Sequence, residues 1–174
     1  MASVTVFRTD KFQIRVHWSV IPAALGLWLL LTIAGQLWLD WPLAQTVWGG
    51  LIATLFLLDG ELVHHLGHAW AAHRTGYPMS GIRLWALLGT SIYPKDEPTL
   101  PAAIHRRRAW GGPIISFLSG LLYGVIALLL RDISPFWYTI FLFAAVVNIL
   151  VFALGALLPL GFTDGSTLIH YWQD

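Results

Sequence analysis

Four long apolar stretches dominate this 174-residue chain and constrain its fold more than any other feature. A helix needs roughly 20 apolar residues to cross a bilayer, and each stretch approaches or exceeds that length. They lie near 19–39, 45–72, 111–130 and 136–158. Only 11% of the residues are charged, against about 25% in an average soluble domain. This composition excludes a soluble enzyme, a disordered chain and a nucleic-acid-binding protein, and it predicts an integral membrane protein.

The basic residues predict how the chain lies in the membrane. Nine of the ten occur before the first helix or near the loop of about 73–110, which joins the second and third helices. Arg131 alone lies on the other side. Because cytoplasmic loops carry the excess of Lys and Arg, both termini are expected in the cytoplasm. We expect a single membrane domain over 1–174, in a bacterial inner (plasma) membrane.

The second apolar stretch carries a stripe of ionisable side chains, formed by Glu61, His64, His65 and His68. At about 100° per residue, the four fall within an arc of about 100° on one helical face. Ionisable groups inside a membrane segment are costly and are functional candidates by default. His64 and His68 have the i, i+4 separation that lets two imidazoles bind one metal ion. The stripe therefore predicts a metal site.

The same stripe has two simpler interpretations. In one, the four side chains lie at the cytoplasmic interface, where water or loop backbone satisfies them. In the other, the histidines are axial ligands of a haem or a chlorophyll.

A tetrahedral metal site needs a third protein ligand from elsewhere in the chain. The candidates are His17, His73, His105, His170, Asp59, Asp132 and Asp164. The second and fourth helices run in the same direction, so the end of the fourth reaches the depth of His64 and His68. Asp164 follows that end in a turn broken by proline and glycine, whereas Asp132 lies on the opposite side. Asp164 is the predicted third ligand, with the alternative that it caps a short helix at 165–172.

With these features the sequence resembles the site-2 protease family, the intramembrane zinc metalloproteases. That family has His-Glu-x-x-His on one membrane helix and Asp-Gly after a later one. Five segments resemble family elements and occur in the family's order. Residues 14–19 resemble the approach to the first helix, 64–72 the zinc helix, and 81–89 the strand that pairs with substrate. Residues 112–116 resemble a Gly-Pro helix start, and 157–165 resemble the third-ligand motif.

The resemblance implies both a fold and a set of metal ligands. The implied fold is an all-α membrane protein, a four-helix bundle like a minimal site-2 protease core, with a short strand or re-entrant segment after the second helix. The implied cofactor is Zn²⁺, and its ligands correspond to His64, His68 and Asp164.

The sequence departs from the family pattern at four positions. His65 stands where the family has the Glu that acts as general base, and Ala156 stands where it has an Asn that helps to hold substrate. Ser116 and Leu88 stand where Asn and Gly are common. Glu61 lies four residues before His65 on the same face, so the two form a candidate substitute base with its orienting carboxylate.

The loss of the family's Glu decides the expected function. General acid–base help is worth roughly 10²–10⁴-fold in rate, so we expect zinc-dependent intramembrane peptide hydrolysis to be silent or severely weakened. Three other outcomes stay open: the Glu61–His65 pair rewires catalysis, His65 becomes a fourth ligand that closes the open position, or the site is empty. The alternative function is a non-catalytic scaffold or accessory subunit of a larger membrane complex. The expected partners are membrane lipids and a transmembrane-helix substrate or partner subunit, with no nucleic acid.

Overall fold

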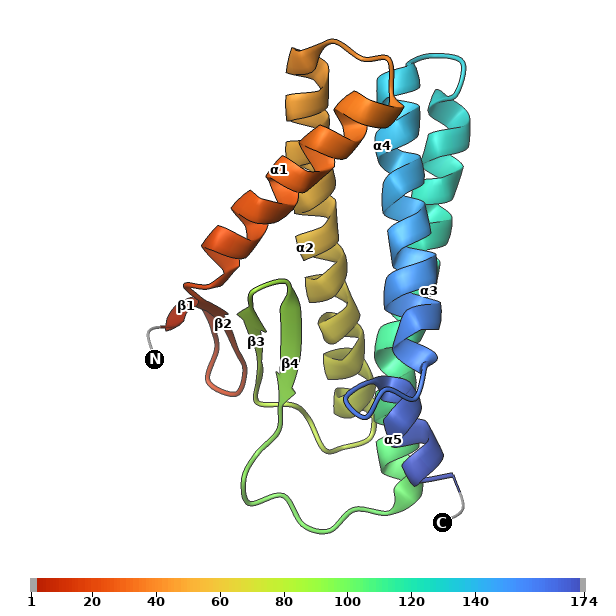
Figure 1. The fold of residues 1–174 in the computed structure, drawn as a ribbon. Helices are drawn as coiled ribbons and strands as arrows, with labels where there is room; N and C mark the ends of the chain where they lie inside the picture. Colours follow the sequence, from red (N-terminus) through yellow and green to blue (C-terminus); the bar gives the residue numbers. More distant parts are fainter. Residues whose placement is uncertain (1–2, 173–174) are drawn as a thin grey trace.

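The computed structural model describes residues 3–172, which form a mostly helical protein with one small sheet (Figure 1). The α-helices are α1 (Val20–Trp38), α2 (Leu43–Arg74), α3 (Ala102–Leu130), α4 (Pro135–Val146) and α5 (Asp164–His170). A π-helix, η1 (Val147–Leu154), and a 3₁₀ turn, η2 (Gly155–Leu157), continue α4. The strands are β1 (Ser3–Arg8), β2 (Gln13–His17), β3 (Gly81–Trp85) and β4 (Leu88–Ile92).

Four helices are long and apolar enough to cross a membrane, namely α1, α2, α3 and the continuous run from α4 to η2. This confirms the four predicted spans, and the chain is an integral membrane protein. The third span begins at Ala102 rather than near 111, so the predicted loop of 73–110 ends at 101. Hydropathy detects only the apolar part of a helix, and the first turns of α3 carry Arg106 to Arg108.

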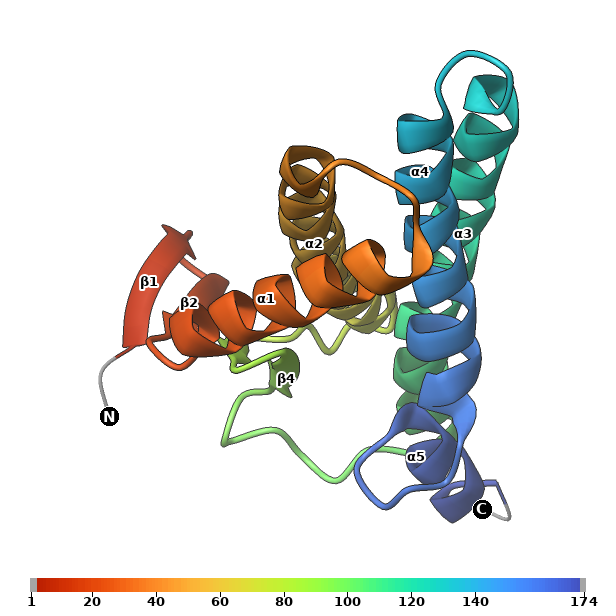
Figure 2. The ribbon, with the colours of Figure 1, turned by 45° about the horizontal axis from the view of Figure 1, so that its top comes forward.

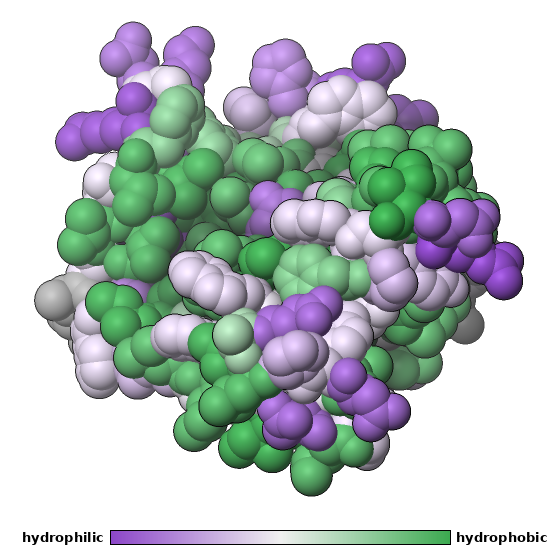
Figure 3. Space-filling model, turned by 90° about the horizontal axis from the view of Figure 1, so that it is seen from above, coloured by the Kyte–Doolittle hydropathy of each residue, from purple (hydrophilic) through white to green (hydrophobic). Residues whose placement is uncertain are grey.

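The spans form a bundle in which α1 is peripheral. Figures 1 and 2 show α3 and α4 running side by side, while α1 slants across α2. α1 packs mainly on α2 and has no buried residue, so most of its surface faces away from the bundle. Hydrophobic side chains also cover much of the surface seen from the end of the bundle in Figure 3. A lipid environment is the natural solvent for such a surface.

The sheet is larger than the sequence predicted. Its order is β1-β2-β3-β4, with β2 and β3 parallel and the two outer pairs antiparallel. The predicted all-α fold with one short strand or re-entrant segment is therefore corrected to a helical bundle with a four-stranded sheet. Apolar residues alternate along these strands, and Ile82 is fully buried against Ala72 of α2. The strands are only five or six residues long, too short for a distinct hydropathy signal, and β1 and β2 precede the first span.

Two glycines set the closest approach of α2 to α3. A Cβ added to Gly111 would collide with the backbone of Gly67, and one added to Gly67 would collide with that of Gly111. The absence of both side chains lets the two backbones touch, which brings the face of α2 that carries His64 and His68 against Gly112 of α3.

The end of the chain returns to α3 after the fourth span. The ring of Tyr171 stacks on that of His105, with centroids 4.1 Å apart and planes at 6°. Arg106 Nη1 also donates a hydrogen bond to the carbonyl oxygen of Tyr171. These contacts dock α5 on the first turns of α3 and carry its first residue, Asp164, to the side of α2.

Candidate metal centre

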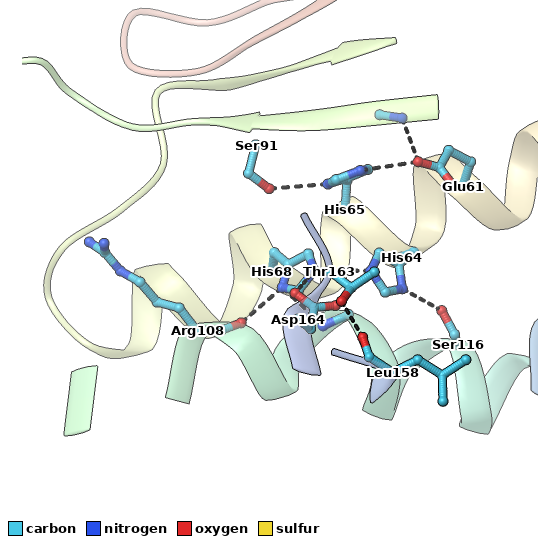
Figure 4. A network of polar contacts seen from close by, with 12 residues as sticks. Glu61, His64, His65, His68, Ser91, Arg108, Ser116, Leu158, Thr163 and Asp164 are labelled. Carbon is cyan, nitrogen blue, oxygen red and sulfur yellow. Dashed lines mark hydrogen bonds and ion pairs between the residues drawn. The ribbon is translucent and has the colours of Figure 1, made fainter. Parts of the chain in front are cut away.

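Three side chains from two distant parts of the chain converge beside α3. His64 and His68 lie one turn apart on α2, and Asp164 begins α5 (Figure 4). The two Nε2 atoms are 3.0 Å apart. Asp164 Oδ2 lies 3.2 Å from His64 Nε2, and Oδ1 lies 3.2 Å from His68 Nε2. The structure therefore brings together the three residues that the sequence nominated as ligands.

The spacing of these atoms suits a tetrahedral zinc ion. Ligands about 2.0–2.1 Å from such an ion lie roughly 3.3 Å from one another. The three observed separations are 3.0, 3.2 and 3.2 Å. Gly112 leaves room beside both imidazoles, since an added Cβ would come within 2.6 Å of His64 Cε1 and closer to both Nε2 atoms. The donor set fits Zn²⁺, the metal that the family resemblance implied.

Each imidazole is oriented by a hydrogen bond from its other nitrogen. His68 Nδ1 lies 2.8 Å from the carbonyl oxygen of Arg108. The backbone nitrogen of Gly112 lies 3.2 Å from the same Nδ1. A carbonyl can only accept, so the shorter contact to Arg108 places the proton on Nδ1 and leaves the lone pair of Nε2 facing the centre. His64 Nδ1 lies 3.1 Å from the hydroxyl of Ser116, a fully buried side chain. Partners of this kind fix the tautomer and the ring plane of a metal-binding histidine.

Replacing Ser116 with Ala is expected to weaken zinc binding by roughly 10–100-fold, the usual effect of losing such a partner. The physical reason is that His64 would lose the contact that holds its ring. Zinc affinity by competition with a chelator measures the effect, and Ser119→Ala, on the same helix, is the control. Equal affinities for the two variants would show that Ser116 does not orient His64.

The turn before α5 positions Asp164 through backbone contacts. Thr163 donates a hydrogen bond from Oγ1 to the carbonyl oxygen of Leu158, and Gly165 packs directly on the backbone of Leu157. Thr163 occupies the N-cap position, and Asp164 is the first residue of the helix. The alternative that Asp164 caps this helix is therefore wrong.

The other half of the polar stripe faces a different element. His65 Nδ1 lies 3.1 Å from Ser91 Oγ of β4, and His65 Nε2 lies 3.2 Å from Glu61 Oε1. Glu61 also accepts a hydrogen bond from the backbone N–H of Gly89. Gly89 has no side chain to obstruct this contact, since a Cβ there would collide with the His65 ring. The stripe thus splits into a pair that meets Asp164 and a pair that meets β4.

A buried arginine joins the metal centre to the loop after β4. Arg108, whose carbonyl supports His68, is 4% exposed. Its guanidinium donates to both carboxylate oxygens of Glu97, at 2.5 and 3.0 Å, and to the carbonyl of Tyr77. It also lies 4.4 Å from the ring centroid of Tyr93. The hydrogen bonds from Arg108 lower the pKa of the Glu97 carboxyl below its ordinary value of 4.5.

The Glu97–Arg108 pair is expected to stabilise the protein above about pH 4.5 and to lose that effect as the pH falls through the lowered pKa of Glu97. Glu97→Gln removes the charge, so it should lower the melting temperature at pH 7 and flatten the decline on acidification. Thermal unfolding in detergent at pH 7 and pH 4 measures both effects. Asp96→Asn, at an exposed neighbour, is the control, and the same pH profile for all three proteins would contradict the assignment.

The remaining candidate ligands lie in other surroundings. His17 Nδ1 contacts Ser19, Asp59 accepts a hydrogen bond from Tyr123, and His105 and His170 both pack on Tyr171. Sequence reasoning noted Ser116 only as a departure from a pattern and gave Arg108 no role at the site. Neither residue has a sequence signal that points to a metal, because each acts through a contact more than 35 residues away in the chain.

Comparison with solved structures identifies the fold. The chain is similar to a site-2 protease from Methanocaldococcus jannaschii, with a TM-score of 0.62 over 99% of this chain and 72% of that one. The two sequences are 19% identical. No sequence model of a protein family matches the chain, and no curated protein matches its sequence. The chain therefore has a site-2 protease-like fold, with a His64, His68 and Asp164 group that could hold a metal ion.

Proposed function

We propose that this chain is a zinc-binding membrane protein of the site-2 protease type in which peptide hydrolysis is lost or severely weakened. The observation that carries the proposal is the surroundings of His65. Both of its ring nitrogens contact other side chains, Ser91 Oγ and Glu61 Oε1, and the residue directly after His64 offers no carboxylate. The three candidate metal ligands, His64, His68 and Asp164, are all present and close together. The position of the family's base holds His65, whose ring nitrogens contact Ser91 and Glu61 instead.

The chain's own residues have distinct parts in such a site. His64, His68 and Asp164 would hold zinc, with Ser116 and the Arg108 carbonyl keeping the imidazoles in place. Bound zinc supplies Lewis-acid polarisation of a peptide carbonyl and activation of water. Peptide hydrolysis also requires a group that moves a proton to the leaving amine, and that group is what the site lacks.

Glu61 supports the same conclusion. Its carboxylate lies one turn before the position of the family's base on α2, and it is already bound to the N–H of Gly89 and to His65. Because the Glu61 carboxylate contacts Gly89 of β4 and His65 of α2, its role is to hold β4 against α2. For this reason we favour silent or weakened hydrolysis over a Glu61–His65 substitute base.

The neighbouring strand suggests what the protein would engage. β4 is one of the two edge strands of the sheet, and it lies against α2 beside His65. Edge strands present backbone groups that can pair with an extended segment of another chain. We propose that a transmembrane segment, as substrate or as partner subunit, lies along this edge, and that both termini of the chain are in the cytoplasm of a bacterial cell.

The test combines metal content with cleavage. The purified protein is analysed for zinc, and it is incubated in proteoliposomes with single-span peptides that carry a reporter at each end. About one zinc per chain with undetectable cleavage supports the proposal. Rapid cleavage that a zinc chelator abolishes would contradict the loss of activity, and absence of zinc would favour the scaffold or accessory-subunit function.

A further inference from the structure

A basic cleft lies on the face of the sheet that points away from α2. Alternate residues of a strand point to opposite faces of a sheet. Ile82 of β3 points to α2 and is fully buried, so its neighbour Arg83 points to the other face. A cleft of about 650 Å³ opens there, lined by Ser3, Thr5, Arg15, His17, Ser19, Arg83 and Trp85.

The two arginines in the cleft are direct neighbours. Arg15 and Arg83 are paired across the parallel strands β2 and β3, and Thr5 of β1 is paired with Arg15. Like charges directly opposite one another destabilise a sheet. Among residues 3–172, neither arginine forms an ion pair, and none of the residues lining the cleft is acidic. The positive charge is therefore concentrated and uncompensated.

His17 lines the same cleft and is held against the start of α1. Its Nδ1 lies 2.7 Å from Ser19 Oγ and 3.3 Å from the backbone nitrogen of Ser19. Ser19 Oγ in turn accepts a hydrogen bond from the backbone N–H of Ala86, in the turn between β3 and β4. Arg15 and Arg83 are both exposed, so their guanidinium groups are the charged groups that an anion in the cleft can reach.

We propose that this cleft binds the phosphate of an anionic phospholipid headgroup. The location argues for a lipid, because Ser19 directly precedes Val20, the first residue of the α1 span. The cleft therefore lies where the chain leaves the membrane, at the level of the headgroups. The indoles of Trp18 and Trp85 are 60% and 40% exposed beside it, as is usual for tryptophan at a membrane interface. The proposal does not depend on whether the metal centre is loaded.

The experiment compares lipids and variants of the full chain in a zwitterionic detergent. Binding of short-chain phosphatidylglycerol and of phosphatidylcholine with the same acyl chains is measured by calorimetry. The protein should prefer phosphatidylglycerol, and Arg15→Gln/Arg83→Gln should weaken that binding by roughly 30-fold. Lys11→Gln/Arg107→Gln removes two exposed charges outside the cleft and should retain the preference.

The other possible results of this experiment would each support or overturn the lipid site. Equal loss in the two double variants would show that net charge alone attracts the lipid, and it would overturn the site. Unchanged binding by Arg15→Gln/Arg83→Gln would do the same. Glycerol phosphate, added without acyl chains, should compete weakly; if it binds as tightly as the lipid, the ligand is a soluble phosphate and the assignment to a lipid is wrong. Equal melting temperatures of the variants confirm that all are folded.

Discussion

Replacing His65 with Glu is expected to give this protein zinc-dependent cleavage of a membrane-spanning peptide, with a gain of roughly 10²–10⁴-fold over the natural sequence. The physical reason is that residue 65 directly follows His64, a proposed zinc ligand, on α2. A carboxylate there could take a proton from the attacking water and pass it to the leaving amine. The natural histidine is engaged with Ser91 and Glu61. Release of cleaved peptide from proteoliposomes measures the gain.

Two companion variants separate chemistry from the loss of the tether. His65→Gln also removes the imidazole but supplies no base, so it should stay inactive. In His65→Glu the new carboxylate faces Glu61 one turn away, and like charges at this spacing repel. The Glu61→Gln/His65→Glu variant removes that repulsion and should be at least as active. If zinc is retained and neither Glu variant cleaves, the defect lies elsewhere, with Ala156 the first position to examine.

Removing the two imidazoles of the proposed centre, in His64→Ala/His68→Ala, is expected to abolish zinc binding. Loss of a supporting hydrogen bond costs a metal site roughly 10–100-fold in affinity, and loss of two of three ligands must cost far more. Elemental analysis of the purified protein should fall from about one zinc per chain to almost none. Asp164→Asn should weaken binding as well, because the amide lacks the carboxylate's charge.

The matched control removes two histidines that are exposed and outside the centre, His73 and His170. The His73→Ala/His170→Ala protein should keep its zinc. If this variant lost as much zinc as His64→Ala/His68→Ala, the metal would be bound adventitiously at the surface. A melting temperature close to that of the natural protein would show that the bundle is intact in both.

Local pattern was enough to locate the four spans and the two histidines that converge with Asp164. An apolar run long enough to cross a bilayer usually forms a transmembrane helix. Two histidines one turn apart on a helix share a face whatever surrounds them. Asp164 needed topology as well, because it approaches α2 only when the second and fourth spans run in the same direction. The structure places Asp164 Oδ1 and Oδ2 3.2 Å from the two imidazoles.

The features that the sequence did not predict depend on contacts between distant segments. The sequence predicted the stripe on α2 as one group. In the structure Glu61 and His65 contact β4, whereas His64 and His68 contact Asp164. The sequence predicted a strand after the second span but not the full sheet, because the first half of the sheet precedes α1 and the second half follows α2. Likewise, η1 is a π-helix in a segment whose composition suits an ordinary helix, so its extra residue per turn has no local signature.

X-ray absorption at the zinc edge tests the central claim most directly, because it counts the imidazoles around the metal in the natural protein. The account predicts two imidazole nitrogens and one carboxylate oxygen, each at about 2.0–2.1 Å, with the remaining position filled by a light atom from solvent. The same spectrum should be recorded for His65→Gln, in which the ligand shell is unchanged. A third imidazole in the natural protein that disappears in His65→Gln would contradict the account, because His65 would then be a ligand that closes the site.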